Sequence, residues 1–187
     1  MHNISVTEWY HQFVQSHVKP GDLCIDATMG NGNDTALLAR LSGPSGHVIA
    51  FDIQEQAVAE THAHLEKLGL LSSCRLVLAS HDTMNEYADP GTVSCIIFNL
   101  GYLPGGNHQT CTHADSSLRA IQTGLELLMP GGLMAICIYR GHKDGAEESE
   151  TILSFLRSLD CRRYLVILSD YINRPNLPPL PVLVIRL

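Results

Sequence analysis

The ten residues from Asp26 to Thr35 read Asp-Ala-Thr-Met-Gly-Asn-Gly-Asn-Asp-Thr and join an apolar segment, 23–27, to a segment with helical spacing, 33–41. The two glycines of this stretch let the backbone turn sharply and approach a ligand closely. The polar side chains at the start of the second segment are of the kind that caps helices. A strand, a glycine turn and a helix in this order begin a βαβ unit, so the stretch predicts a parallel sheet covered by helices.

The rest of the chain repeats this alternation of apolar strands and helices. We expect further helices at 5–18, 56–68, 115–128 and 146–159, and further strands at 47–51, 75–79, 93–98, 133–139, 163–168 and 181–187. No long helix separates the last two strands, which predicts that they pair antiparallel. We therefore expect a single α/β domain over residues 1–187. Its doubly wound, seven-stranded, mostly parallel sheet with an antiparallel final strand is the Rossmann-like layout of class I methyltransferases that use S-adenosylmethionine (SAM).

The composition is that of a folded, acidic protein. Of the 187 residues 45% are hydrophobic and 17% are charged, and the net charge is −7. This charge argues against a broad basic surface for long nucleic acid but permits a small RNA contact. The apolar runs are far shorter than the roughly 20 residues that cross a bilayer, and the first ten residues lack a signal-peptide pattern, so we expect a cytoplasmic protein without a membrane segment. The absence of a Cys-x-x-Cys pair predicts free thiols and no metal site for Cys24, Cys74, Cys95, Cys111, Cys137 and Cys161.

The glycine turn is more acidic than a dinucleotide-binding turn. A Gly-x-Gly-x-x-Gly fingerprint would need a third glycine, and Asp34 puts negative charge where a pyrophosphate would sit. Asp26 adds a second carboxylate, and the lack of a Gly-Lys-Ser/Thr sequence excludes a P-loop. SAM has no phosphate and carries a cationic sulfonium and an ammonium group. The turn therefore predicts SAM as the cofactor, held near Asp26, Gly30 and Gly32.

Two further strand ends fit a nucleoside. Asp52 ends the second strand 20 residues after Gly32, the position from which a carboxylate binds both ribose hydroxyls. Ser80 and His81 follow the third strand, where adenine is expected. For His81 two interpretations stay open at this point: a ligand contact, or a side chain that caps a loop.

The residues after the fourth strand predict the methyl-acceptor site. They read Asn-Leu-Gly-Tyr-Leu-Pro-Gly-Gly from Asn99 to Gly106 and resemble the Asn-Pro-Pro-Tyr motif of amine methyltransferases, with Leu-Gly in place of Pro-Pro. An Asn side-chain oxygen can hold an acceptor N–H and aim the nitrogen lone pair, so we expect Asn99 to be catalytic by positioning. Tyr102 can stack on a flat base. The alternative is that Asn99 only caps a turn.

Polar loops at the same sheet edge complete the predicted acceptor site. Residues 105–112 contain two glycines and are expected to form a lid. The basic loop 139–145 could hold a phosphate or favour a neutral amine through its cationic rim, and the alternative is that it is only a solvated loop. The residues expected to contact the acceptor are Leu100, Gly105, Gly106, Arg140, His142 and Arg174. The sequence singles out no general base, although His142 or Tyr102 could relay a proton.

Four motifs together resemble one bacterial family across essentially the whole chain. They are the segments 26–35, 80–82 (Ser-His-Asp), 99–106 and 139–142 (Tyr-Arg-Gly-His), and the family, once labelled rRNA methylases, is now understood to methylate tRNA. The resemblance implies conversion of 5-aminomethyl-2-thiouridine at the tRNA wobble position to 5-methylaminomethyl-2-thiouridine. It implies the tRNA anticodon loop as partner, a homodimer, and SAM contacts from Asn31, Asn33, Asp52, Gln54, Ser80 and His81.

Three other functions remain open from the sequence. A SAM-dependent methyltransferase of a small-molecule amine would suit the acidic net charge. A non-catalytic SAM-binding, RNA-associated subunit would keep the cofactor site without turnover. An NAD-dependent oxidoreductase is disfavoured by the missing third glycine and the acidic turn.

Overall fold

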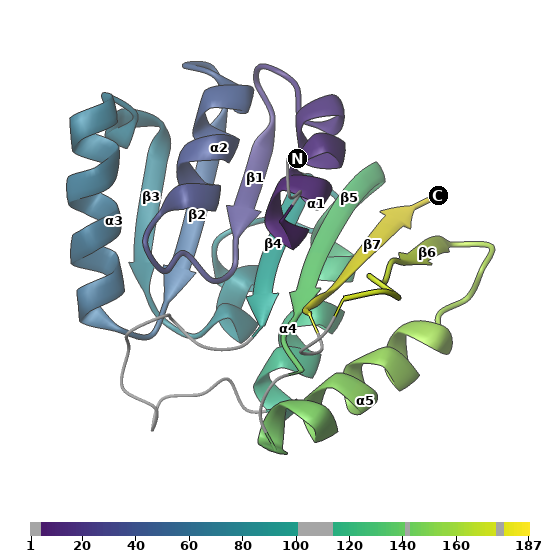
Figure 1. Cartoon of the computed structure of the whole chain (residues 1–187). Coiled ribbons are helices and arrows are strands. Elements are labelled where there is room, and N and C mark those ends of the chain that lie inside the picture. Colours follow the sequence, from purple (N-terminus) through teal and green to yellow (C-terminus); the bar gives the residue numbers. More distant parts are fainter. Residues whose placement is uncertain (1–4, 101–113, 141–142, 175–177) are drawn as a thin grey trace.

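The computed structural model describes residues 5–100, 114–140, 143–174 and 178–187. It is a single sheet with helices on both faces (Figure 1). The elements, in chain order, are α1 (Val6–His17), β1 (Leu23–Asp26), α2 (Asn33–Ser42), β2 (His47–Asp52), α3 (Glu55–Leu68), η1 (Leu71–Ser73), β3 (Cys74–Leu78), η2 (His81–Glu86), β4 (Val93–Leu100), α4 (Ala114–Leu127), β5 (Leu128–Ile138), α5 (Lys143–Arg157), β6 (Tyr164–Leu168) and β7 (Leu180–Arg186).

The sheet confirms the predicted topology. Its seven strands run in the order β3-β2-β1-β4-β5-β7-β6. The pairs from β3 to β5 are parallel, whereas β7 is antiparallel to both β5 and β6. The order reverses between β1 and β4, and ligands of open α/β sheets bind beyond the carboxyl ends of the strands at such a switch point.

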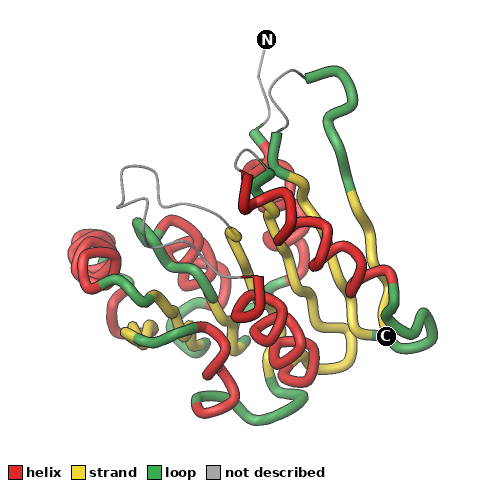
Figure 2. The backbone as a smooth tube through the Cα atoms, turned by 90° about the horizontal axis from the view of Figure 1, so that it is seen from below, coloured by secondary structure: helices red, strands yellow, loops and turns green. Residues whose placement is uncertain are grey.

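Two layers of helix bury the sheet. α1, α2 and α3 cover one face, and α4, α5 and η2 cover the other (Figures 1 and 2). Alternate residues of β4 supply the two cores: Ile96 and Phe98 pack toward α4, while Cys95 and Ile97 pack toward α1 and α2. The central strands read as continuous apolar runs because both of their faces are covered.

The fifth strand begins earlier than predicted. It starts at Leu128 instead of residue 133, so that Pro130, Gly131 and Gly132 lie within the strand and do not precede it. The register shifts between Val93 and Cys95, and this irregularity absorbs the extra residues. A Pro-Gly-Gly sequence normally marks a turn, but an irregular strand end accommodates it here.

Helix α1 is anchored so that one face reaches the carboxyl edge of the sheet. Ser5 and Glu8 form a capping box at its start. Tyr10 and Val14 are buried against the core that includes Cys137 of β5, and the helix packs on β5 and β7. None of the helices in the described ranges is long and apolar enough to cross a membrane.

Candidate active site

A buried carboxylate shapes the turn between β1 and α2. Oδ1 of Asp26 accepts a hydrogen bond from the Thr28 backbone nitrogen at 3.1 Å, and Oδ2 accepts one from the Thr35 hydroxyl at 2.6 Å. Burial, with the nearby charge of Asp34, raises the pKa of Asp26. Because Asp26 is fully buried, its carboxylate holds the turn from inside, and a direct contact with the cofactor stays a prediction.

The glycine turn also requires a residue without a side chain. Gly32 has a φ of 76°, and a Cβ atom there would lie 2.9 Å from the side chain of Thr61. The Thr61 hydroxyl donates to the Gly30 carbonyl oxygen at 2.9 Å, which ties α3 to the turn. Asn31 and Asn33, predicted cofactor ligands, flank Gly32 and are exposed.

Asp52 lies beside this turn at the end of β2. One of its oxygens accepts from the Gly30 backbone nitrogen at 3.1 Å, and the other accepts from the Gln54 backbone nitrogen at 3.0 Å. A carboxylate oxygen can accept two hydrogen bonds, so each keeps a lone pair for a hydroxyl. The neighbouring Ile53 exposes 53% of its surface. An anchored carboxylate beside an uncovered apolar side chain fits a nucleoside with a ribose diol and a flat base.

His81 presents a buried acceptor without a partner. Its Nδ1 lies 3.2 Å from the Ala27 carbonyl oxygen, which can only accept, so Nδ1 carries the ring proton. Burial lowers the pKa of His81 and keeps the ring neutral. Its Nε2 has no hydrogen-bond partner among the described residues. A buried lone pair of this kind fits an N–H donor such as the amino group of adenine.

Asn99, at the end of β4, is held at both its backbone and its side chain. Its backbone nitrogen donates to the Thr28 hydroxyl at 2.7 Å, and its Nδ2 donates to Oδ2 of Asp34 at 2.6 Å. These contacts join the end of β4 to the turn after β1 and to the first turn of α2. The structure thus brings the predicted catalytic amide next to the predicted cofactor turn.

Asp34 is the centre of a cluster that includes two side chains of α1. Oδ2 accepts from the Tyr10 hydroxyl at 2.8 Å, and Oδ1 lies 2.5 Å from Nε2 of His11. Burial opposes ionisation of Asp34, but hydrogen bonds from His11, Tyr10 and Asn99 and the charge of His11 outweigh it and hold its pKa below the usual range. Burial and the Asp34 charge raise the pKa of Tyr10, so its hydroxyl remains a donor.

The structure describes only some of the predicted acceptor residues, and their surroundings differ. Leu100 is buried in the core, so its side chain does not face a substrate. Arg140 donates to the Pro178 carbonyl oxygen at 2.9 Å and lies 3.3 Å from Asp170, so its guanidinium ties β5 to the segment before β7. Arg174 is exposed after β6. The other predicted residues lie outside the described ranges: Tyr102, Gly105, Gly106 and His142.

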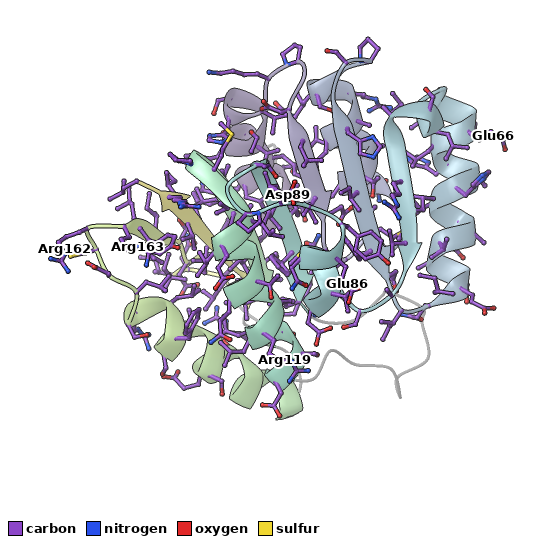
Figure 3. All side chains as sticks on the ribbon, turned by 180° about the vertical axis from the view of Figure 1, so that it is seen from behind. Glu66, Glu86, Asp89, Arg119, Arg162 and Arg163 are labelled. Atoms are coloured by element: carbon purple, nitrogen blue, oxygen red, sulfur yellow. The ribbon has the colours of Figure 1, made fainter. Side chains whose placement is uncertain are left out.

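Figure 3 labels three further arginine side chains, which lie away from the site or are paired with an aspartate. Arg162 and Arg163 lie between α5 and β6, and Arg162 is paired with Asp160 at 3.0 Å (Figure 3). Arg119 of α4 is paired with Asp82 at 3.0 Å. Within the described ranges, His, Cys, Asp and Glu side chains form no group that could hold a metal ion.

Sequence reasoning missed Tyr10 and His11, and it included Tyr139 only as part of the loop 139–145 and of the motif 139–142, without a role of its own. The first two lie on α1, which reads only as an amphipathic helix and gives no local signal of a site. Tyr139 directly follows β5, which pairs with the end of β4 that carries Asn99. Its backbone nitrogen donates to the Leu100 carbonyl oxygen at 3.0 Å, and 39% of its surface is exposed. The signal available in the sequence was an aromatic residue at the end of the predicted strand 133–139.

Known proteins are similar to this chain in both sequence and fold. Residues 48–185 match the family described as "Putative rRNA methylase". A chloroplastic tRNA (mnm5s2U34)-methyltransferase of Arabidopsis thaliana is 35% identical over 183 residues, which make up 93% of this chain and 67% of that protein.

Two solved structures match along nearly their whole length. One is described as a putative rRNA methylase from Clostridium thermocellum, with a TM-score of 0.96, 38% identity and 100% of both chains covered. The other is described as a putative methyltransferase from Streptococcus mutans in complex with SAH, with a TM-score of 0.88, 38% identity and 97% of both chains covered. The strand order is thus that of a methyltransferase fold, and the chain belongs to the Putative rRNA methylase family.

Proposed function

We propose that this protein uses SAM to methylate the amine of 5-aminomethyl-2-thiouridine at the wobble position of tRNA, giving 5-methylaminomethyl-2-thiouridine. The observation that carries the proposal is the Asn99 amide, fixed by Asp34 at 2.6 Å beside the cofactor turn. The name of the Arabidopsis relative, a tRNA (mnm5s2U34)-methyltransferase, supports the choice of substrate.

SAM is the cofactor, and the described residues fit it. The Streptococcus mutans structure contains SAH, which is SAM without its methyl group. In this chain Asp52 offers lone pairs for the ribose, Ile53 an apolar surface, and Nε2 of His81 an acceptor for an amino group. When bound, SAM supplies a methyl group on a positively charged sulfur, which a neutral nitrogen can accept.

The chain must therefore hold an amine in its neutral form and aim its lone pair. A side-chain carbonyl such as that of Asn99 can accept one N–H of the amine and fix the direction of the lone pair. The acceptor is an alkylamine, which is mostly protonated near neutral pH. The sequence singles out no general base, so we propose that the amine binds after losing its proton to solvent, or through His142 or Tyr102.

The proposed partner is the anticodon loop of tRNA, with two protomers forming a homodimer as the family resemblance implies. With a net charge of −7, the protein is expected to contact few phosphates. Its affinity for tRNA should therefore fall only modestly as salt rises.

Mass spectrometry of nucleosides tests the proposal. Purified protein and SAM are incubated with tRNA from cells that lack the gene, and the wobble nucleoside is followed. Conversion to the N-methyl form is expected with wild-type protein and is expected to fall sharply with Asn99→Ala. Retained SAH binding without any conversion would contradict the tRNA substrate and favour a small-molecule amine. Full activity of Asn99→Ala would contradict the role given to the amide.

A further inference from the structure

The Asn99 amide is held by Asp34, a neighbour that is not among the predicted catalytic, cofactor or acceptor residues. We propose that Asp34 is a positioning residue that sets the orientation of the Asn99 amide, and that His11 of α1 holds Asp34 in place. The inference rests on the proposed amine-methylating function, which it deepens by adding two residues to the acceptor side of the site.

The chemistry of the two groups fixes which way the amide faces. An ionised carboxylate has no proton to donate, so Asn99 must turn its NH2 group toward Asp34. The distance of 2.6 Å from Nδ2 to Oδ2 is that of a short, charge-assisted hydrogen bond. The backbone of Asn99 is held separately by the Thr28 hydroxyl at 2.7 Å. With the backbone and Nδ2 both fixed, the direction of Oδ1 is fixed as well.

The Tyr10 hydroxyl lies close to both groups but has a single proton. It is 2.8 Å from Oδ2 of Asp34 and 3.3 Å from Oδ1 of Asn99. The shorter contact, to a charged acceptor, takes the proton. Since a carbonyl oxygen has two lone pairs, Oδ1 of Asn99 retains acceptor capacity for the N–H of a substrate amine.

His11 completes the coordination of the carboxylate. Its Nε2 lies 2.5 Å from Oδ1 of Asp34, and the Asp34 side chain is only 8% exposed. A carboxylate buried to this degree is costly unless donors surround it. Three donors from α1 and β4 meet this need, and they make α1 a part of the site and not merely a cover for β5 and β7.

Two substitutions of Asp34 separate positioning from charge. Asp34→Asn can place its amide oxygen where Oδ2 lies, accept from Asn99 and Tyr10, and turn its NH2 group toward Nε2 of His11. Asp34→Ala removes every acceptor. We expect Asp34→Ala to lower kcat by about 10²-fold, on the scale of a misplaced catalytic group, with little change in KM or in SAH affinity. Asp34→Asn should retain most of kcat, and Asn99→Ala combined with Asp34→Ala should cost no more than Asn99→Ala alone.

Substitutions of His11 provide a second test on a more exposed residue. His11→Ala should lower kcat, and His11→Gln should restore it because the Gln amide can donate to Oδ1 of Asp34. Equal losses for Asp34→Asn and Asp34→Ala would show that the charge is what matters and would overturn the proposal. Full activity of Asp34→Ala would overturn it as well.

An experiment without turnover keeps this inference distinct from the proposed function. In 15N-labelled protein the side-chain amide signal of Asn99, assigned from its loss in Asn99→Ala, should be shifted by its hydrogen bond to the carboxylate. The shift should collapse in Asp34→Ala and change less in Asp34→Asn. Wild-type protein that fails to methylate tRNA but shows this pattern would contradict the proposed function alone. An Asn99 signal that is unaffected by Asp34→Ala would contradict the positioning role, whatever the substrate.

Discussion

The carboxylate of Asp52 accepts a hydrogen bond from the backbone nitrogen of Gly30 at 3.1 Å, so the end of β2 is tied directly to the turn after β1. The contact places an anchored negative group, with lone pairs to spare, where the nucleoside is expected. Asp52 therefore holds the glycine turn, and we predict that its remaining lone pairs accept hydrogen bonds from the cofactor.

Asp52→Asn is expected to weaken SAH binding roughly 10- to 100-fold, since a hydrogen bond to a charged group contributes about 1.5–3 kcal/mol. Isothermal titration calorimetry measures the change. Glu66→Gln is the matched control, because it removes the same charge from an exposed position near the opposite end of α3 (Figure 3). An unchanged affinity in Asp52→Asn would contradict the ribose assignment.

Gly32→Ala is expected to destabilise the protein more than an alanine at a similar backbone conformation elsewhere. Gly32 and Gly69 have φ values of 76° and 69°, but a Cβ at Gly32 would meet Thr61 at 2.9 Å, whereas a Cβ at Gly69 meets nothing within 4 Å. Gly69→Ala should cost about 1–2 kcal/mol for the left-handed conformation alone. Urea unfolding should show a larger loss for Gly32→Ala. Equal losses would mean that the contact with Thr61 relaxes freely.

Arg140→Ala tests whether this side chain serves the fold or the substrate. Its guanidinium holds the Pro178 carbonyl oxygen at 2.9 Å, so its loss should lower the free energy of unfolding by about 1–2 kcal/mol. A purely structural role predicts that KM for tRNA changes little in the fraction that remains folded. A large rise in KM without any loss of stability would instead support the predicted substrate contact. Thermal unfolding and steady-state kinetics on the same sample distinguish the two.

The sequence predicts those features of the molecule that depend on residues close together in the chain. The glycine turn needs Gly32 because of its own backbone conformation, and the strand order follows from βαβ units and a helix-free final pair. The predicted start of β5 was wrong. Pro130, Gly131 and Gly132 are residues typical of a turn before a strand, but the strand includes them where its register with β4 is irregular.

The cluster around Asp34 has no such local cause. Tyr10 and His11 come from α1, and Asn99 lies 65 positions after Asp34, so only the packing of α1 on β5 and the adjacency of β1 and β4 bring them together. Periodicity identified α1 as a helix with a buried face, but it could not show that this face reaches the site. Similarly, Leu100 lies in a site-like motif, yet the alternation along β4 directs its side chain into the core.

The buried carboxylate of Asp26 makes stability depend on pH in a predictable direction. Burial, with the nearby charge of Asp34, raises the pKa of Asp26 above its ordinary value of 3.8. A carboxyl whose pKa is higher in the folded state favours folding while it is protonated, and this contribution is lost as pH rises through the folded-state pKa. Asp26→Asn keeps the size of the side chain and removes the titration.

The free energy of unfolding of wild-type protein, minus that of Asp26→Asn, should therefore fall as pH rises from about 4. Urea unfolding of both proteins at a series of pH values measures this difference. Asp160→Asn, at a partly exposed carboxyl whose pKa is lowered by Arg162, provides a control with the opposite slope. A difference that stays flat or rises with pH would show that hydrogen bonds from Thr28 and Thr35 keep Asp26 ionised despite its burial.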